Sequence, residues 1–564
     1  MNEMSGAEAM VRMLRLFGVR HVFGLCGDTS LPFYDALYRH GDGITHILAR
    51  DERSAAYMAD GYARASGRAG VCEGPSGGGA TYILPGVVEA NESSVPVLAL
   101  TTDISVGGRG RYTLTELDQE ALFWPLAKWN RVIDRAADIP KTVRAAFTQM
   151  TSGRPGAAHI GFPYDVQRET VDEGEIWGDA RLGGYPSRRF GPDPAAIEEA
   201  AHLLLAARNP LFICGGGVVI AGAEADLQAV AERLGAPVAS TVSGHGSIAD
   251  NHPLAVGVVG SNGGTMPTRA LVELADLVVF VGCRAGSVTT ERWRFPAPGR
   301  VKLIHIDADP AVIGASYPTD VAIVADARLA LAELGRVLRQ APPPVPERTL
   351  DARRVAQAKA EKFAAFAALA RSDERPIRPE RIVADLRAVL PEDAIVVLDP
   401  GTPCPYFSAY YELARAGRHM WSNRAHGALG YSMAAAVGAS FGRPGAKVVS
   451  VMGDGSFAFT AGELETIVRL KLPIAMLVVS NAAFGWIKAG QKAGFERRYF
   501  SVDFTRTDHA AVAAAFGVKS WKVEDPAELR PTLKHAVEAG EPALVDIICQ
   551  PLEEARAPVS EWVA

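Results

Sequence analysis

Short runs of consecutive apolar, mostly β-branched residues recur along the chain and alternate with longer segments whose apolar positions have helical spacing. These runs are too continuous for half-exposed antiparallel strands and are typical of parallel strands buried on both faces. They lie at 21–25, 95–102, 210–217, 276–282, 301–309, 394–401, 447–455, 474–481 and 542–549. Alternation of this kind over the whole length predicts an α/β fold built from doubly wound parallel sheets.

Two stretches without periodicity interrupt this alternation. Residues 178–194 are rich in Gly, Pro and Arg, and residues 341–350 form a proline-rich segment that favours extended backbone. A length of 564 residues also suits several domains. We therefore expect three α/β domains, a linker and a short C-terminal tail. The domains span 1–180, 190–341 and 376–550, the linker 342–375 and the tail 551–564.

Composition and charge narrow the functional classes. The 58 basic and 64 acidic residues give a formal net charge of −6 without a basic stripe, so we expect no nucleic-acid partner. The cysteines are far apart and form no CxxC or Cys/His cluster, which argues against a disulfide framework or a zinc site. No apolar run reaches about 18 residues, so we expect no membrane partner. The charged N-terminal segment 1–20 predicts an amphipathic helix, not a signal peptide, and the protein is expected to be cytoplasmic.

One candidate site lies in the last predicted domain. Gly453, Asp454 and Gly455 end a buried strand, and Asn481 ends the next buried strand after an intervening helix pattern. In an open parallel sheet, ligands bind outside the carboxyl ends of the strands. Carboxylate and amide oxygens suit Mg²⁺, and glycines let a diphosphate approach the backbone closely. Gly-Asp-Gly alone also fits an ordinary strand-ending turn, but its pairing with Asn481 favours a metal–diphosphate site.

A second candidate site lies in the first predicted domain. Residues 47–67 read as a buried strand, then Glu52, then a helix of small residues. A carboxylate in the first turn of a helix is favoured by the helix dipole, which is the structural interpretation. The functional interpretation is a carboxyl in an apolar pocket, whose raised pKa lets it exchange a proton with a ligand.

With these segments the sequence resembles the thiamine diphosphate-dependent enzymes, and among them the acetohydroxyacid (acetolactate) synthase-like group. Segments 23–37, 75–101 and 151–166 are similar to the family's pyrimidine-binding domain, and 425–439 to the segment that holds the cofactor bent. The resemblance covers nearly the whole chain. It implies a pyrimidine-binding, a central and a diphosphate-binding domain, in this order.

The resemblance also implies roles for individual residues. Glu52 would be catalytic and hydrogen-bond N1′ of the aminopyrimidine, and Leu429 would lie under the bend of the cofactor. The metal ligands would be the side chains of Asp454 and Asn481 and the carbonyl of Ala483. Further contacts with the cofactor would come from Thr402, Gly427, Gly453, Gly455 and Ser456.

Other residues lie in segments that line the pocket in relatives. Thr115 is one, and His426 is another, which fits either a catalytic proton shuttle or a hydrogen-bonded structural histidine. Asp28 fits either the pocket or the N-cap of the following helix. Lys488 fits either a contact with an anionic substrate or a solvated surface lysine.

The sequence departs from the acetohydroxyacid synthase pattern at three places near the substrate. Leu114-Thr115-Glu116 stands where that group has Phe-Gln-Glu, and residues 284–288 replace its Arg-Phe-Asp-Asp-Arg segment. Gly490 stands where the group has a tryptophan that selects the acceptor keto acid. These departures predict intact cofactor machinery with a different substrate pocket.

We therefore expect a thiamine diphosphate- and Mg²⁺-dependent lyase or carboligase acting on a 2-oxo acid or related carbonyl donor. Alternatives within the family are a 2-oxo acid or acyl-CoA decarboxylase and a hydrolytic C–C cleaving enzyme. An alternative outside it is a nicotinamide-type oxidoreductase, against which the incomplete glycine fingerprint at 215–217 argues.

The same resemblance bears on the nucleotide content of the central domain and on the assembly of the chains. In relatives the central domain holds FAD, ADP or nothing, and the glycines at 215–217 with Asp307 leave these options open. Relatives hold the two ends of one cofactor with domains from different subunits. Since Glu52 and Asp454 lie in different domains, the resemblance implies a homodimer or homotetramer with its sites at the subunit interface.

Overall fold

The computed structural model describes residues 3–344 and 348–560, so the parts of the predicted N-terminal helix, linker and tail at 1–2, 345–347 and 561–564 lie outside the described residues. The chain divides into two compact units. One comprises Met1–Arg188, Asn423–Ala446 and Thr460–Leu472, and the other Arg189–Ser422, Lys447–Phe459 and Pro473–Ala564. In the described ranges, no helix has the length and apolar character needed to cross a membrane.

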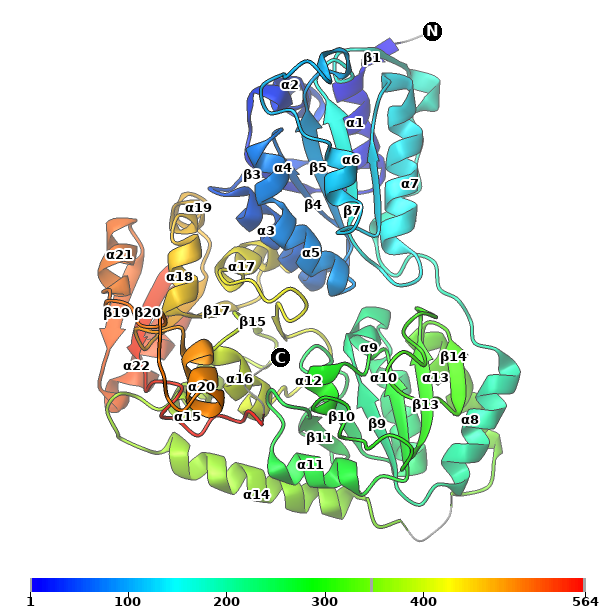
Figure 1. Ribbon diagram of the computed structural model, residues 1–564, viewed down its shortest axis with the longest axis vertical. Helices are drawn as coiled ribbons and strands as arrows, with labels where there is room; N and C mark the ends of the chain where they lie inside the picture. The colour runs from blue at the N-terminus through cyan, green and yellow to red at the C-terminus, as the bar shows by residue number, and fades with distance from the viewer. Residues whose placement is uncertain (1–2, 345–347, 561–564) are drawn as a thin grey trace. The chain divides into compact units, whose positions relative to one another are not determined.

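The first unit is built on a parallel six-stranded sheet. Its strands follow the order β3 (Thr45–Leu48), β2 (His21–Gly24), β4 (Gly70–Gly74), β5 (Val97–Asp103), β7 (Ala158–Pro163) and β6 (Trp129–Val132). Helices α1 (Gly6–Leu16), α2 (Leu31–His40) and α7 (Ile139–Thr151) pack on one face through a single apolar core (Figure 1). Helices α3 (Glu52–Ser66) and α5 (Leu84–Glu92) pack against strands of the same sheet and against each other.

Helix α17 (Ser432–Gly442) packs closely along α3 in this unit. A Cβ added at Gly438 would lie 1.8 Å from the Met58 carbonyl oxygen, and one at Gly61 2.1 Å from the Ala435 carbonyl oxygen. The two backbones therefore touch, which only glycine permits at these positions. This packing fixes the middle of α3, the helix that begins at Glu52, against α17.

The second unit contains the central sheet, also parallel and six-stranded. The strand order is β11 (Ala255–Val258), β10 (Val238–Ser240), β9 (Pro210–Cys214), β12 (Leu277–Val281), β13 (Lys302–Asp307) and β14 (Val321–Val324). Helices α8 (Pro194–Ala206), α10 (Glu224–Leu234) and α13 (Ala327–Gln340) share one core with it, and α11 (Met266–Glu273) and α14 (Ala352–Ala370) share another. Apolar side chains thus cover both faces of the sheet.

The same unit contains a third parallel sheet of six strands. They follow the order β16 (Met420–Ser422), β15 (Ile395–Leu398), β17 (Val448–Gly453), β18 (Ala475–Ser480), β20 (Ala543–Ile548) and β19 (Lys519–Val523). Helices α15 (Pro379–Val389), α16 (Pro403–Tyr410) and α22 (Pro526–Glu538) share its core. Helix α14 packs on α11 and on α15, so it joins the two sheets of this unit (Figure 1).

The predicted α/β class with three parallel sheets is confirmed, and each of the continuous apolar runs coincides with one strand of these sheets. Two local features differ from the prediction. The helix after Gly-Asp-Gly begins directly at Asp454, as α18 (Asp454–Thr460), and α19 (Glu463–Arg469) follows as a separate helix. Strand β1 (Glu3–Ser5) pairs antiparallel with β8 (Thr170–Asp172). This pair was not predicted, because strands of three residues are too short to show a hydrophobic pattern.

Candidate active site

Glu52 is the first residue of α3, just beyond the end of β3. The cap of this helix is Asp51, whose carboxylate accepts the amides of Arg53 at 2.8 Å and Ser54 at 3.3 Å. Glu52 therefore has no capping role. Its side chain is buried, at 7% exposure, and this burial raises its pKa, with a further rise from the neighbouring Asp51 and Glu73. A proton on this carboxyl is held more tightly than on an exposed glutamate.

The segment before α17 carries three predicted site residues. Gly427 has a φ of +74°, in the left-handed region that favours glycine. Leu429 is half-buried and His426 is exposed. The side-chain amide of Asn423 donates to the Ala428 carbonyl at 2.6 Å and closes this segment into a loop. Gly427, Leu429 and His426 therefore lie in the same unit as Glu52, on one ordered loop.

A buried glutamate on α5 holds this loop in place. One oxygen of Glu89 accepts the amide of His426 at 2.7 Å and that of Ala425 at 3.2 Å. Its other oxygen accepts from Arg64 of α3 at 3.3 Å and from Ser93 at 2.5 Å. Sequence reasoning missed Glu89, because α5 also contains Asn91 and Glu92 and its pattern does not single out one glutamate.

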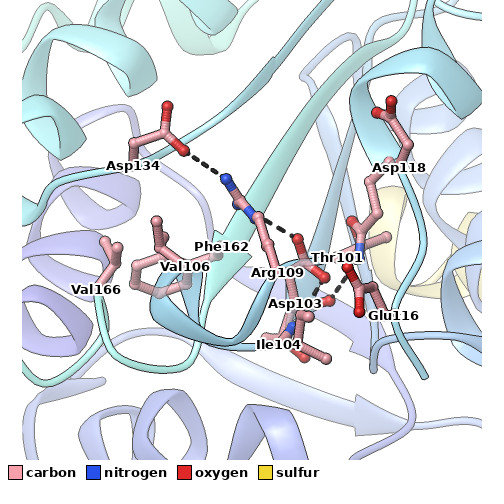
Figure 2. A network of polar contacts seen from close by, with 12 residues as sticks. Thr101, Asp103, Ile104, Val106, Arg109, Glu116, Asp118, Asp134, Phe162 and Val166 are labelled. Atoms are coloured by element: carbon pink, nitrogen blue, oxygen red, sulfur yellow. Dashed lines mark hydrogen bonds and ion pairs between the residues drawn. The ribbon is translucent and has the colours of Figure 1, made fainter. Parts of the chain in front are cut away.

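A polar network orders the loop that follows β5 and carries Thr115 (Figure 2). Asp103, the last residue of β5, is buried, and this desolvation raises its pKa to about 6. Arg109 lies 3.5 Å from Asp103 and donates to Asp134 at 2.7 Å. Glu116 accepts the amide of Gly110 at 2.5 Å. The loop is thus anchored at its start and folded onto itself.

Thr115 lies in this loop at a φ of +68° and is exposed. Its hydroxyl is 2.7 Å from that of Ser76, whose amide donates to the Thr29 hydroxyl at 3.1 Å. The Thr29 hydroxyl is 2.8 Å from that of Thr102. A chain of hydroxyls therefore follows the carboxyl ends of β4 and β5 and ends at Thr115, and sequence reasoning did not find Ser76 or Thr29. Asp28 lies in a short 3-10 turn, and the N-cap of α2 is Ser30, so the N-cap interpretation of Asp28 was wrong.

Asp454 joins the ends of two strands in the second unit. One of its oxygens accepts the Gly455 amide at 2.9 Å, and the other accepts the amides of Asn481 at 2.8 Å and Ala482 at 2.6 Å. Burial raises the pKa of Asp454, and these three amides oppose the rise. The turn that brings Asn481 to Asp454 places Ala482 at a φ of +58°.

The remaining residues of the predicted metal–diphosphate set lie at the same edge of the third sheet. Asn481 donates from its side-chain amide to the Thr402 hydroxyl at 3.4 Å and accepts the Ala483 amide at 3.2 Å. A Cβ added at Gly453 would meet no atom within 4 Å, so open space adjoins this backbone. Ser456 is buried on α18. The ends of β15, β17 and β18 thus bring together the predicted Thr402, Gly453, Asp454, Gly455, Ser456, Asn481 and Ala483.

Two other candidates have structural explanations. Lys488 pairs with Asp503 at 2.7 Å and with Glu553 at 2.9 Å, which favours its structural interpretation. In the central sheet, a Cβ at Gly215 would lie 2.1 Å from the Gly282 carbonyl oxygen, and one at Gly217 2.6 Å from the Gly282 Cα. Packing between two strand ends therefore requires these glycines without any nucleotide.

Three protein-family models match the chain. They are "Thiamine pyrophosphate enzyme, N-terminal TPP binding domain" at residues 4–122, "Thiamine pyrophosphate enzyme, central domain" at 197–334 and "Thiamine pyrophosphate enzyme, C-terminal TPP binding domain" at 399–547. The first covers Glu52 and Thr115, and the third covers Leu429, Asp454 and Asn481.

Curated relatives match over nearly the whole length. The probable acetolactate synthase large subunit of Methanocaldococcus jannaschii is 36% identical over 559 residues, which are 98% of this chain and 93% of that protein. The acetolactate synthase isozyme 3 large subunit of Escherichia coli K12 is 31% identical, over 95% of this chain and 93% of that protein. The acetolactate synthase large subunit of Corynebacterium glutamicum is 30% identical, over 97% and 87% respectively.

Proposed function

The chain belongs to the thiamine pyrophosphate enzymes, in their acetolactate synthase-like group, and on this premise we propose that it is a thiamine diphosphate- and Mg²⁺-dependent carboligase with a 2-oxo acid donor. The proposal rests on two separate groups of residues, each at the carboxyl ends of parallel strands. The first unit holds a buried carboxyl with a raised pKa at Glu52. The second holds hard oxygen ligands at Asp454 and Asn481, next to open space at Gly453.

The residues of the second unit fit a Mg²⁺–diphosphate group. The Asp454 oxygen that accepts only the Gly455 amide retains a lone pair for a metal. The Asn481 side chain and the Ala483 carbonyl add neutral oxygens, and Mg²⁺ accepts a few such ligands together with phosphate oxygens. With no lysine or arginine in this set, the metal would neutralise most of the diphosphate charge.

The residues of the first unit fit the aminopyrimidine end. When bound, thiamine diphosphate supplies the carbanion chemistry by which a 2-oxo acid loses CO₂ and its acyl carbon joins an acceptor carbonyl. Glu52 would hold a proton at N1′ and return it, for which its raised pKa suits it. Gly427 and Leu429 would hold the cofactor's shape from the loop that Glu89 anchors, and Thr115 and His426 would face the substrate.

We propose that the acceptor pocket differs from that of acetolactate synthases. Thr115 has a short side chain bonded to Ser76, and Gly490 is buried on α20 (Gly485–Gly494) without a side chain to shape the pocket. The alternatives within the family, a decarboxylase or a hydrolytic C–C cleaving enzyme, do not join the acyl carbon to an acceptor carbonyl. The match to synthase large subunits along the whole chain does not favour these alternatives. A nicotinamide oxidoreductase is not favoured either, since packing explains the glycines at Gly215 and Gly217.

Cofactor content and assembly complete the proposal. FAD or ADP in the central domain remains a prediction, which the absorbance spectrum and released nucleotide of the purified protein test. We propose the domain boundaries 1–180, 190–341 and 376–550, one domain for each parallel sheet. Because Glu52 and Asp454 belong to different units, we also propose a homodimer or homotetramer with complete sites at the subunit interface.

The direct test is a substrate screen with product identification. The enzyme with thiamine diphosphate and Mg²⁺ is given a panel of 2-oxo acids, singly and in donor–acceptor pairs, and CO₂ and carbon products are followed. We expect CO₂ release together with a 2-hydroxy ketone product, absent with Glu52→Gln. Release of CO₂ with only a free aldehyde would indicate a decarboxylase, and no turnover of any 2-oxo acid would contradict the proposal.

A further inference from the structure

Helix α19, in the first unit, begins with a buried glutamate. Glu463 is the first residue of this helix and is 1% exposed. One of its carboxyl oxygens accepts the backbone amide of Arg50 at 2.9 Å, and the other accepts the Thr466 hydroxyl at 2.7 Å. Both oxygens of this buried carboxyl are therefore hydrogen-bonded, one of them to an amide that is 413 residues away in the chain.

The Arg50 amide belongs to the three-residue connection between β3 and α3. The strand ends at Leu48 and the helix begins at Glu52, so Arg50 lies two residues before Glu52. On the sheet side of this connection, the Ala49 amide donates to the Gly24 carbonyl at 3.0 Å. The connection is thus held by the sheet at Ala49 and by α19 at Arg50.

A second side chain of α19 binds the same part of the chain. Arg469, the last residue of the helix, donates from its guanidinium to the Leu48 carbonyl at 2.6 Å. Its Nε donates to Glu465, one turn earlier in the helix, at 2.9 Å, and this orients the planar guanidinium. A Cβ added at Gly462, just before the helix, would lie 3.7 Å from the Arg50 Cβ. Helix α19 therefore lies against the end of β3 and is hydrogen-bonded there through its first and its last residue.

We propose that Glu463 and Arg469 are positioning residues that hold Glu52 in the place its proton exchange requires. This inference rests on the proposed role of Glu52 toward the aminopyrimidine. The two side chains bind the backbone at Arg50 and Leu48, and the connection from there to Glu52 is too short to absorb a shift. Displacement of a catalytic group by about 1 Å can cost about a hundredfold in rate.

The proposed role depends on the acceptor oxygen of Glu463 and not on its charge. Burial contributes most to the raised pKa of Glu52, and the neighbouring charges that add to the rise are those of Asp51 and Glu73. In Glu463→Gln the side-chain carbonyl can still accept the Arg50 amide, while its –NH₂ group donates to the threonine hydroxyl of the same helix. The amide variant should therefore keep the connection in place, whereas Glu463→Ala removes the acceptor.

The first test needs no cofactor and uses the full-length protein. Infrared titration of the protonated-carboxyl band, assigned to Glu52 by its loss in Glu52→Gln, reports the pH midpoint at which Glu52 ionises. In Glu463→Ala the connection loosens and water reaches Glu52, so we expect this midpoint to fall by about half a pH unit or more. Glu463→Gln should keep the wild-type midpoint.

The second test measures deuterium exchange at C2 of bound thiamine diphosphate together with calorimetric cofactor affinity. In Glu463→Ala and in Arg469→Ala, exchange should slow by about tenfold or more while affinity stays within about threefold. Glu463→Gln should exchange within about threefold of the wild-type rate. A residue that only stabilises the fold would instead lower the melting temperature without slowing exchange in the folded holoenzyme.

Glu380→Ala is the matched control. Glu380 is also a buried glutamate in the first turn of a helix, α15, but it lies in the second unit. Its replacement removes a buried carboxyl without touching the connection between β3 and α3. The Glu52 midpoint and the C2 exchange rate should both stay at their wild-type values.

The outcomes separate this inference from the proposed function. An unshifted midpoint or wild-type exchange in folded Glu463→Ala would overturn the positioning role and leave the proposed function standing, as would equal losses in Glu463→Gln and Glu463→Ala. Wild-type exchange in Glu52→Gln would instead overturn the role of Glu52 and the proposed function with it. If Glu463→Ala does not fold, Arg469→Ala decides, because the Arg469 side chain is 35% exposed and lies outside the core. Wild-type exchange in that variant would then overturn the inference.

Discussion

The contact between α3 and α17 allows a sharp test of how the first unit holds Glu52 and the loop before α17. Replacing Gly438 by alanine adds one methyl group where the Met58 carbonyl oxygen would be only 1.8 Å away and the Tyr62 amide nitrogen 2.7 Å. Both neighbours are backbone atoms of α3, so no side-chain rotation can relieve the clash. Carbon and carbonyl oxygen approach to about 3.3 Å at closest, so the helices must separate by about 1.5 Å at this point.

The expected change in the free energy of unfolding of Gly438→Ala is the difference between two effects. Overpacking of this kind destabilises by about 1–3 kcal/mol, whereas alanine gains about 1 kcal/mol over glycine inside a helix. Since the clash is with rigid backbone, the upper part of the first range applies, and we expect a net destabilisation of about 1–2 kcal/mol. For a unit of this size, this lowers the midpoint of its thermal transition by about 2–8 °C.

Gly335→Ala in α13 is the matched control. Gly335 is also a buried mid-helix glycine, but the nearest atoms to its added Cβ, on the Arg339 and Val230 side chains, are 3.4 Å away. This variant should be neutral or more stable by up to about 1 kcal/mol. Differential scanning calorimetry and thiamine diphosphate affinity are measured for both variants. Gly438→Ala should also lower the affinity for thiamine diphosphate, because separating α3 from α17 moves Glu52 away from the loop before α17. Equal melting temperatures and equal cofactor affinities of the two variants would refute this account of the packing.

Three further predictions concern single carboxylates. Asp454→Ala should lose Mg²⁺-dependent cofactor binding because the diphosphate charge is left poorly neutralised, and unchanged affinity in calorimetry would remove Asp454 from the metal site. Glu89→Gln should lower the affinity for thiamine diphosphate several-fold by loosening the loop at His426, while Glu380→Gln should not. The pKa of Asp103 is raised to about 6, so the native state favours its neutral form. The wild type should therefore lose stability relative to Asp103→Asn as the pH rises from 4 to 6, and parallel stability profiles would contradict this.

The fold could be predicted from the sequence because parallel strands buried on both faces form continuous apolar runs. The strands in 276–282 and 474–481 show this most clearly, since β12 and β18 lie within them. Boundaries that depend on backbone hydrogen bonds could not be predicted equally well. Helix α18 begins at Asp454 because the chain turns directly from the strand, and nothing in the pattern of apolar residues marks that turn.

The site could be predicted where a short motif fixes both chemistry and position. Asp454 and Asn481 end neighbouring strands, and the structure places the amide of one within 2.8 Å of the carboxylate of the other. Contacts between distant segments carry no such signal. Glu89 reaches His426 across more than three hundred residues, and the pairing of Glu463 with Arg50 depends on how α19 lies against the end of β3.

Glu52 as the proton partner of the bound cofactor is the central claim, and proton exchange at C2 of thiamine diphosphate tests it most directly. The holoenzyme is mixed rapidly with deuterium oxide, quenched in acid, and the C2 proton signal is followed by nuclear magnetic resonance. Wild type should exchange this proton far faster than free cofactor, and Glu52→Gln, with cofactor still bound and the fold intact, should lose at least about a hundredfold of that rate. Exchange at the wild-type rate in Glu52→Gln would contradict the account.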